Sequence, residues 1–209
     1  MAGNSVNSPI YGDYPLNESA PWWLLKEMPR RVARAEYEKA ISDKGDRISI
    51  LAKCLERAGF PLSNSDEDVQ ALSDWFVAVI EPLPDEDLPN GATLSLCQDV
   101  SFYLGELMIA KHAELHWEFF VWGKNNISYQ SPVIMGFPSE APRSRGNLGL
   151  SRIVYGYACR VLANRRGYAQ ELEVPPGHPL SGISIEPPPV DRNEFIGILR
   201  SVDRRCLPV

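Results

Sequence analysis

The stretch TLSLCQDVSFYLGELMIAKH, residues 93–112, decides the fold class of this 209-residue chain. Apolar side chains recur along one face at helical spacing: Cys97, Val100, Leu104, Leu107 and Met108. Others lie across the axis, so that only a narrow strip is polar: Ser95, Asp99 and Glu106. A helix that is apolar around most of its circumference is usually buried at the centre of its domain. The segment therefore predicts a central helix over Thr93–His112.

The residues that follow this helix predict a small antiparallel sheet. In HWEFFVW, residues 116–122, the pattern changes from the helical period to the two-residue period of a strand. GKNN, residues 123–126, has the composition of a turn, and strand-like residues continue over 127–130 and 133–137. Pro132 between them requires a sheet edge or a bulge. We expect two or three short strands packed on the central helix.

Helix signals also occur on the N-terminal side of the central helix. Ser19 and Pro21 are suited to begin a helix. Pro29 interrupts it, which predicts a short helix, a kink and a second helix over residues 30–41. A further helix is expected over residues 46–59, because it begins with an aspartate and ends at a glycine.

Three more segments complete the chain. Ser65 followed by three acidic residues is typical of a helix N-terminus, and that helix should end before Pro82. Apolar spacing predicts another helix over residues 150–165. Residues 172–190 contain six prolines and should be extended, with little capacity for strand pairing, and a short helix is expected over 192–204.

These elements fit one domain of the α+β class that is mainly helical. Residues 1–18 are rich in Asn, Ser, Gly and Pro and are expected to form a flexible N-terminal arm. Residues 19–171 form the domain. Residues 172–209 hold the Pro-rich segment and the last helix, which we expect to dock back on the domain.

The composition excludes several classes of protein. Hydrophobic residues make up 44% and charged residues 23%, which excludes a wholly disordered chain, a collagen and a coiled coil. The four cysteines stand singly, without zinc or redox spacing, and are expected to be reduced thiols. There is no apolar run that could span a membrane and no signal peptide. We therefore expect a cytoplasmic protein without a cofactor.

Asp99 and Glu106 are the carboxylates best placed for a buried or cleft site, since they share the polar strip of the central helix. Two helical turns separate their backbones by about 10.5 Å, which disfavours a tight catalytic dyad. The alternatives are exposure to solvent or pairing with arginines such as Arg152 and Arg160.

His112 and His116 are four residues apart, the spacing that lets two imidazoles bind zinc from one helical face. The order is HAELH rather than HExxH, and the segment lies where helix gives way to strand. We favour two histidines near a helix end that interact with its dipole. Together with Asp99 and Glu106 they define the enzyme alternative, a hydrolase-like activity with or without a metal ion.

Charged residues are segregated along a chain whose net charge is −6. Residues 66–87 hold eight acids and no base, among them Asp85, Glu86 and Asp87, whereas residues 143–166 hold six arginines and no acid. Opposed patches favour internal pairing or self-association into a homo-oligomer. Nucleic-acid binding through Arg143–Arg166 is a minor alternative because the chain as a whole is acidic, and we expect no membrane partner.

Tryptophans cluster near the ends of elements: Trp22, Trp23, Trp117 and Trp122. Trp117 and Trp122 are an odd number of residues apart, so a regular strand directs them to opposite faces. One of them should pack in the core, and the other should be exposed or covered by the Pro-rich segment. An exposed tryptophan would be an anchor for a partner.

Residues 94–137 resemble the centre of small bacterial α+β domains found among immunity-type and uncharacterised proteins. The resemblance is carried by YLGE at 103–106 on the helix, Trp117 on a strand, and SPVI at 131–134 on the next strand. In such proteins the helix packs on a short sheet that carries a Trp. The resemblance implies a binding or neutralising role rather than a reaction.

The sequence contains no nucleophile elbow, P-loop, dinucleotide fingerprint or kinase signature. The favoured hypothesis is therefore a non-enzymatic cytosolic module that binds a protein partner, of immunity type, through an acidic and aromatic surface. The candidate binding residues are Asp99, Glu106, Trp117, Trp122, Asp85, Glu86 and Asp87.

Overall fold

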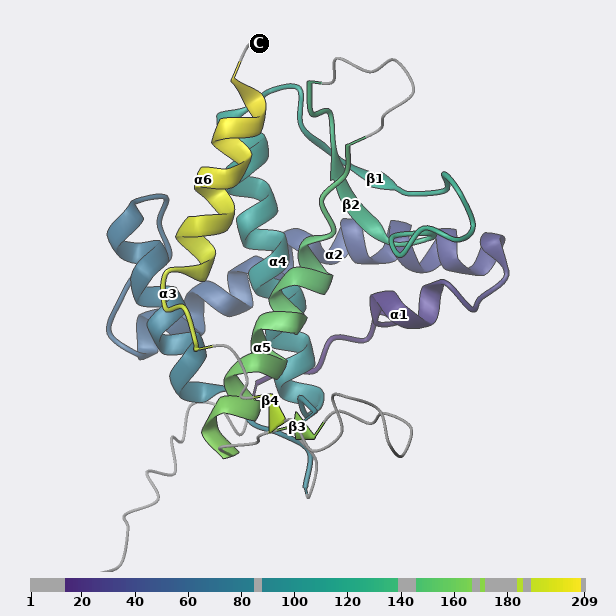
Figure 1. Ribbon diagram of the computed structural model, residues 1–209. Helices are drawn as coiled ribbons and strands as arrows, with labels where there is room; N and C mark the ends of the chain where they lie inside the picture. Colours follow the sequence, from purple (N-terminus) through teal and green to yellow (C-terminus); the bar gives the residue numbers. More distant parts are fainter. Residues whose placement is uncertain are drawn as a thin grey trace, which may run out of the picture.

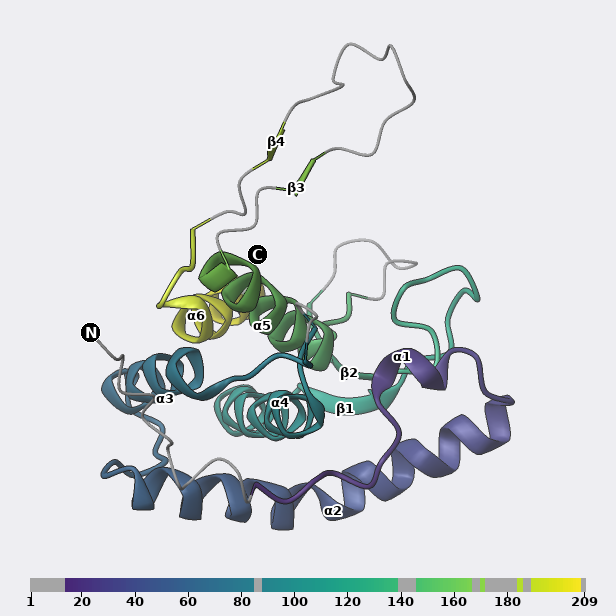
Figure 2. The ribbon, with the colours of Figure 1, turned by 90° about the horizontal axis from the view of Figure 1, so that it is seen from below.

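The segment quoted above forms helix α4, Gly91–Lys111, at the centre of the molecule (Figure 1). The computed structural model describes residues 14–84, 88–138, 146–166, 170–171, 184–185 and 189–207. Asn90 caps α4, because its side chain accepts a hydrogen bond from the Thr93 backbone N–H. Seen along its axis, α4 lies between α2 (Arg30–Arg57) and α5 (Leu150–Arg166) (Figure 2). The prediction of a buried central helix is confirmed.

Helix α2 is one continuous helix of 28 residues, where the sequence predicted two. The prediction ended one helix at Ile41 and began the next at Asp46, but Gly45 between them lies in the exposed interior of α2. A glycine in a helix interior costs about 1 kcal/mol. Burial of one face offsets that cost, since residues spaced by seven are all buried: Ala33, Ala40, Arg47 and Cys54.

The remaining helices are found close to the predicted positions. They are α1 (Trp22–Leu25), α3 (Asp66–Val79) and α6 (Glu194–Cys206). Ser65 caps α3 as expected, because its Oγ accepts a hydrogen bond of 3.1 Å from the Asp68 backbone N–H. In the described part of the chain, no helix has the length and apolar character needed to cross a membrane.

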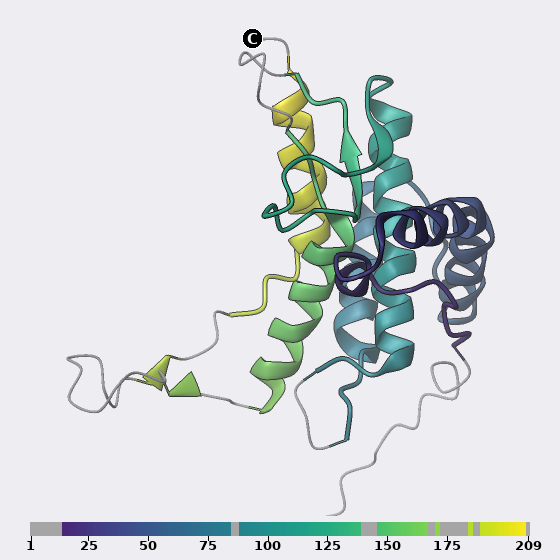
Figure 3. The ribbon, with the colours of Figure 1, turned by 90° about the vertical axis from the view of Figure 1, so that its right-hand side faces the viewer.

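Three aromatic rings join α3, α5 and α6 inside the core. Phe195 of α6 lies edge-on to Phe76 of α3 and to Tyr157 of α5, with ring centroids 5.3 and 5.6 Å apart, and Phe76 stacks on Tyr157. All three side chains are fully buried. The last helix therefore docks on the body, where it contacts α3 and α4, and in Figure 3 it lies above α5.

A two-stranded antiparallel sheet packs on α4. Strand β1, His116–Phe119, pairs with β2, Pro132–Met135, in a register that places Trp117 opposite Ile134. Pro132 is the first residue of β2, a position that tolerates the missing backbone N–H. The fold is thus α+β and mainly helical, as the sequence predicted.

The strands are shorter than predicted. Strand β1 ends at Phe119 rather than Trp122, and residues 127–130 form turns instead of a strand. Gln130 adopts a left-handed backbone conformation with φ 61°, which interrupts strand geometry. Its side-chain amide donates a hydrogen bond of 2.7 Å to the Leu25 carbonyl oxygen, so this turn is tied to α1.

A second, very short ladder lies in the C-terminal part of the chain. Strand β3, Gln170–Glu171, pairs with β4, Ser184–Ile185, in antiparallel register. Strand β4 falls within residues 172–190, where the prolines predicted little strand pairing, so a short ladder is a correction to that expectation. The rest of that segment up to residue 188 lies outside the described residues.

Residues 14–18 lie against the body of the molecule, although the sequence assigned them to a flexible arm. Tyr14 is only 4% exposed and belongs to the main hydrophobic cluster, which contains residues of every helix from α2 to α6. The Asn17 backbone N–H donates a hydrogen bond of 2.8 Å to Ser95 Oγ of α4. The expected arm is thus wrong for these residues, and residues 1–13 lie outside the described part.

Candidate functional site

An apolar cavity of about 180 Å³ lies where residues 14–21, called here the N-terminal segment, meet α1, α2, α4 and α5. Its lining includes three aromatic side chains, those of Trp22, Trp23 and Tyr155, together with Leu94 of α4. Leu16 at its rim is 63% exposed. We call this space the aromatic cavity.

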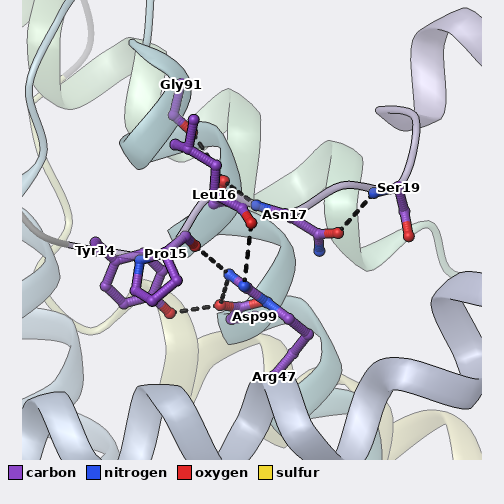
Figure 4. Close-up of polar contacts among 9 residues, drawn as sticks. Tyr14, Pro15, Leu16, Asn17, Ser19, Arg47, Gly91 and Asp99 are labelled. Atoms are coloured by element: carbon purple, nitrogen blue, oxygen red, sulfur yellow. Dashed lines mark hydrogen bonds and ion pairs between the residues drawn. The ribbon is translucent and has the colours of Figure 1, made fainter.

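Arg47 and Asp99 hold the N-terminal segment in place (Figure 4). Asp99 has no exposed surface and accepts hydrogen bonds of 2.9 and 2.6 Å from Arg47 Nε and Nη2. Asp99 Oδ2 also accepts one of 2.5 Å from the Tyr14 hydroxyl. The Arg47 guanidinium donates further to the carbonyl oxygens of Pro15, at 2.9 Å, and Leu16, at 3.4 Å. One buried arginine thus joins α2, α4 and the N-terminal segment.

Burial dominates the protonation of this cluster. It raises the pKa of Asp99 from 3.8 to about 6, against the lowering effect of hydrogen bonds from Arg47 and Tyr14. Burial and the neighbouring Asp99 charge raise the pKa of Tyr14 well above 10.0, so the phenol stays a donor. Burial alone would lower the pKa of Arg47, but the hydrogen bonds and charges of Asp99 and Tyr14 together outweigh this effect and raise it. The cluster has a structural role, in which hydrogen-bond donors of Arg47 and Tyr14 enclose the carboxylate of Asp99.

Glu106, the second candidate carboxylate, has different partners. It accepts a hydrogen bond of 2.9 Å from Trp117 Nε1 and lies 2.7 Å from Lys44 Nζ, and its side chain is 39% exposed. Asp99 and Glu106 therefore do not form a dyad. The expectation that they pair with arginines of α5 or form a solvent strip is wrong for Asp99, because α2 and the N-terminal segment cover it.

The two histidines belong to different elements. His112 is the C-cap residue that follows α4, and its Nε2 lies 2.8 Å from Asp203 Oδ1 of α6. His116 begins β1, and its exposed ring lies 3.5 Å from Glu118 Oε2. Because α4 ends at Lys111, the zinc-like spacing falls across a helix end. Among the residues that the structure describes, no group of three or more His, Cys, Asp or Glu side chains could hold a metal ion.

Trp117 and Trp122 divide between core and surface. Trp117 packs over Gly105 of α4 and lies edge-on to Phe102, with ring centroids 5.7 Å apart. Trp122 lies beyond the end of β1 and is 46% exposed, with its Nε1 3.5 Å from Glu118 Oε1. Neither residue lines the aromatic cavity.

The acidic candidates Asp85, Glu86 and Asp87 lie outside the described residues. The residues on either side are described: Leu83 and Leu88 are 37% and 48% exposed, and the Leu83 backbone N–H donates to the Leu88 carbonyl oxygen at 2.7 Å. The acidic triplet is therefore bracketed by exposed leucines.

Two arginines of α5 have partners inside the molecule. Arg165 donates hydrogen bonds to the carbonyl oxygens of Ile80, at 2.6 Å, and Val77, at the C-terminal end of α3. Arg160 Nη2 lies 2.7 Å from Glu194 Oε1 of α6. The first two arginines of the basic stretch, Arg143 and Arg145, lie outside the described residues. Arg160 and Arg165 are thus paired within the molecule, with Glu194 and with main-chain carbonyl oxygens rather than with the acidic side chains of residues 66–87.

Sequence reasoning missed Arg47, Tyr14 and the aromatic cavity. One signal was present for Arg47, since it interrupts a series of small apolar residues spaced by seven along α2. A charged residue in such a series requires a buried partner. Tyr14 carries no comparable local signal, because its partner Asp99 is 85 residues away in the sequence. No family model, curated protein or solved structure matches this chain.

Proposed function

We propose that this protein is a non-enzymatic cytoplasmic binding module that neutralises a protein partner, and that the aromatic cavity receives an apolar side chain of that partner. The observation that carries this proposal is an aromatic-lined cavity with an exposed leucine at its rim. Large apolar anchors that enter such pockets supply most of the binding energy in protein interfaces.

Exposed apolar side chains near the cavity support a protein partner. Leu16 lies beside the start of α4, where its Cδ2 is 3.6 Å from the position that a Gly91 Cβ would occupy. Leu24, between the lining residues Trp23 and Leu25 of α1, is 46% exposed. Exposed leucines around a pocket exclude water from an anchor that binds in it. The exposed leucines therefore make the surface around the cavity suitable for contact with a protein partner.

The charge of the chain supports a basic partner. The net charge is −6, and three acids, residues 85–87, stand between the exposed leucines Leu83 and Leu88. Complementary charge accelerates association and discriminates against acidic competitors. We therefore propose a partner whose apolar anchor is surrounded by Lys or Arg.

The positions of the candidate catalytic residues favour binding over catalysis. Asp99 is enclosed by the donors of Arg47 and Tyr14, and neither Asp99 nor Glu106 lines the aromatic cavity. His112 and His116 pair with carboxylates on α6 and β1. Catalysis needs several groups within reach of one substrate, and these four do not converge on the cavity.

A capture experiment with matched variants tests the proposal. Gln98 lines the cavity from α4, so Gln98→Trp should fill it, whereas Ser42→Trp adds an equally large ring at an exposed position of α2. The three proteins are immobilised and exposed, at native salt, to an extract of the cells that produce the chain. We expect a protein retained by the wild type and by Ser42→Trp but lost from Gln98→Trp.

The captured protein is then purified and its own activity is measured with and without this chain. Inhibition by the wild type, with inhibition by Gln98→Trp weakened at least tenfold, would support neutralisation. Retention of the same proteins by all three baits, or of none by the wild type, would show that the cavity does not bind a partner.

A further inference from the structure

The aromatic rings beside the cavity form one contiguous cluster. The ring centroids of Trp22 and Trp23 are 5.7 Å apart with perpendicular planes, and those of Trp23 and Tyr155 are 5.2 Å apart. Trp22 and Tyr155 meet at 6.5 Å with planes at 73°. Such a cluster offers both ring edges and ring faces to a further ring, which prefers edge-to-face or offset contacts.

The size of the cavity matches one ring. Its volume is about 180 Å³, and an engineered apolar cavity of about 150 Å³ binds benzene. The same volume leaves little room for a second ring or for a long side chain.

Two polar side chains of the lining already have hydrogen-bond partners within the protein. Ser95 Oγ accepts a hydrogen bond from the Asn17 backbone N–H, and Glu36 Oε2 accepts one of 3.1 Å from the Ala20 backbone N–H. The carboxylate of Glu36 disfavours an anionic ligand. The three rings are in mutual contact, so they leave no gap between their faces that would enclose a cation.

We infer that the aromatic cavity binds a single uncharged aromatic ring. This inference rests on the proposed function, in which the ring belongs to a Phe, Tyr or Trp side chain of the protein partner. Trp22 is able to adjust to such a ring, because its buried indole nitrogen has no hydrogen-bond partner among the described residues and no such bond has to be broken.

Amides of single amino acids test the inference without knowledge of the partner. The full chain is titrated with N-acetylphenylalaninamide, N-acetylleucinamide and tetramethylammonium, and the indole N–H signals are followed by NMR. The signals of Trp22 and Trp23 are assigned from Trp22→Phe and Trp23→Phe variants. We expect a saturable shift of both signals with the phenylalanine amide and binding at least tenfold weaker for the leucine amide.

The variants described above serve as controls. Gln98→Trp should remove the saturable response and Ser42→Trp should retain it, with thermal unfolding used to confirm that both proteins fold. The inference is overturned by a non-saturable response in the wild type, by equal binding of the phenylalanine and leucine amides, by stronger binding of tetramethylammonium, or by an unchanged response in a folded Gln98→Trp protein.

Failure of the inference and failure of the proposed function are distinguishable. If the phenylalanine amide binds but no protein is captured, the cavity binds an aromatic ring and the proposed protein partner is excluded. A captured partner with no response to the phenylalanine amide would leave the binding function standing and show that its anchor is not an aromatic ring.

Discussion

Arg47 of α2 meets Asp99 of α4 through two hydrogen bonds, of 2.9 and 2.6 Å, at a point where the carboxylate has no exposed surface. Each charge depends on the other, because an isolated buried ion is strongly unfavourable. The pair also positions Tyr14 and thereby the segment that forms one wall of the aromatic cavity.

Removal of one partner of this pair should destabilise the fold. Asp99→Ala leaves the guanidinium of Arg47 buried without its counter-ion, which costs about 3–5 kcal/mol of unfolding free energy. Chemical denaturation measures the loss. The double variant Arg47→Met with Asp99→Leu should regain at least half of it, because neither buried charge remains. A single variant with wild-type stability would contradict a buried pair.

The stability of the protein should depend on pH through Asp99. Its pKa is raised from 3.8 to about 6 in the folded state, so between these values the folded protein binds more protons than the unfolded chain. The contribution of Asp99 to the unfolding free energy is therefore present below about pH 4 and lost as the pH rises to about 6.

Asp99→Asn isolates this contribution from that of the other carboxylates. The difference in unfolding free energy between wild type and variant, measured by denaturation at intervals from pH 4 to pH 6.5, should shrink by about 1–3 kcal/mol as the pH rises. A difference that is constant or grows over this range would mean that the carboxyl group is ionised throughout.

Gly105 is required by close packing of Trp117. A methyl group at Gly105 would overlap the indole ring, so Gly105→Ala should lower the unfolding free energy by about 1–3 kcal/mol. Gly45, in the exposed interior of α2, is the matched control, since its Cβ position has no neighbour within 4 Å. Gly45→Ala should stabilise by about 0.5–1 kcal/mol. Thermal unfolding of the two variants should thus move in opposite directions.

Arg165 should stabilise α3 from outside that helix. It donates hydrogen bonds to the carbonyl oxygens of Val77 and Ile80. These oxygens lie at the C-terminal end of α3, where the helix offers no following backbone N–H to donate to them. Arg165→Ala should cost about 1–2 kcal/mol of unfolding free energy. Amide hydrogen exchange should accelerate in the last turn of α3, and Arg165→Lys should restore part of the protection. If exchange accelerated by the same factor in all helices, the substitution would instead have lowered the stability of the whole fold.

Local signals in the sequence were sufficient for most helices. The apolar circumference of α4 predicted its central position, and the cap at Ser65 located the start of α3. The tight contact between Gly105 and Trp117 supports the predicted packing of a strand on α4. These features depend on residues that are close together in the chain, where spacing reflects structure directly.

The features that sequence reasoning missed depend on contacts between distant residues. The sequence predicted a break between Ile41 and Asp46, and only burial of one face of α2 shows that the helix continues through Gly45. The polar residues of α4 predicted a face exposed to solvent, although Asp99 among them is covered by Arg47 and Tyr14. The aromatic cavity combines α1 and α5, which are more than a hundred residues apart.

The attachment of the N-terminal segment bears on how the chain folds during synthesis. Tyr14 is translated 85 residues before its partner Asp99, an interval of roughly 4–17 s at common ribosomal speeds. Until Asp99 is made, the phenol of Tyr14, and later the guanidinium of Arg47, lack the carboxylate that accepts hydrogen bonds from both. The earliest residues of the described chain thus reach their native position only after the middle of the protein has left the ribosome, and the aromatic cavity is assembled later still, when Tyr155 emerges.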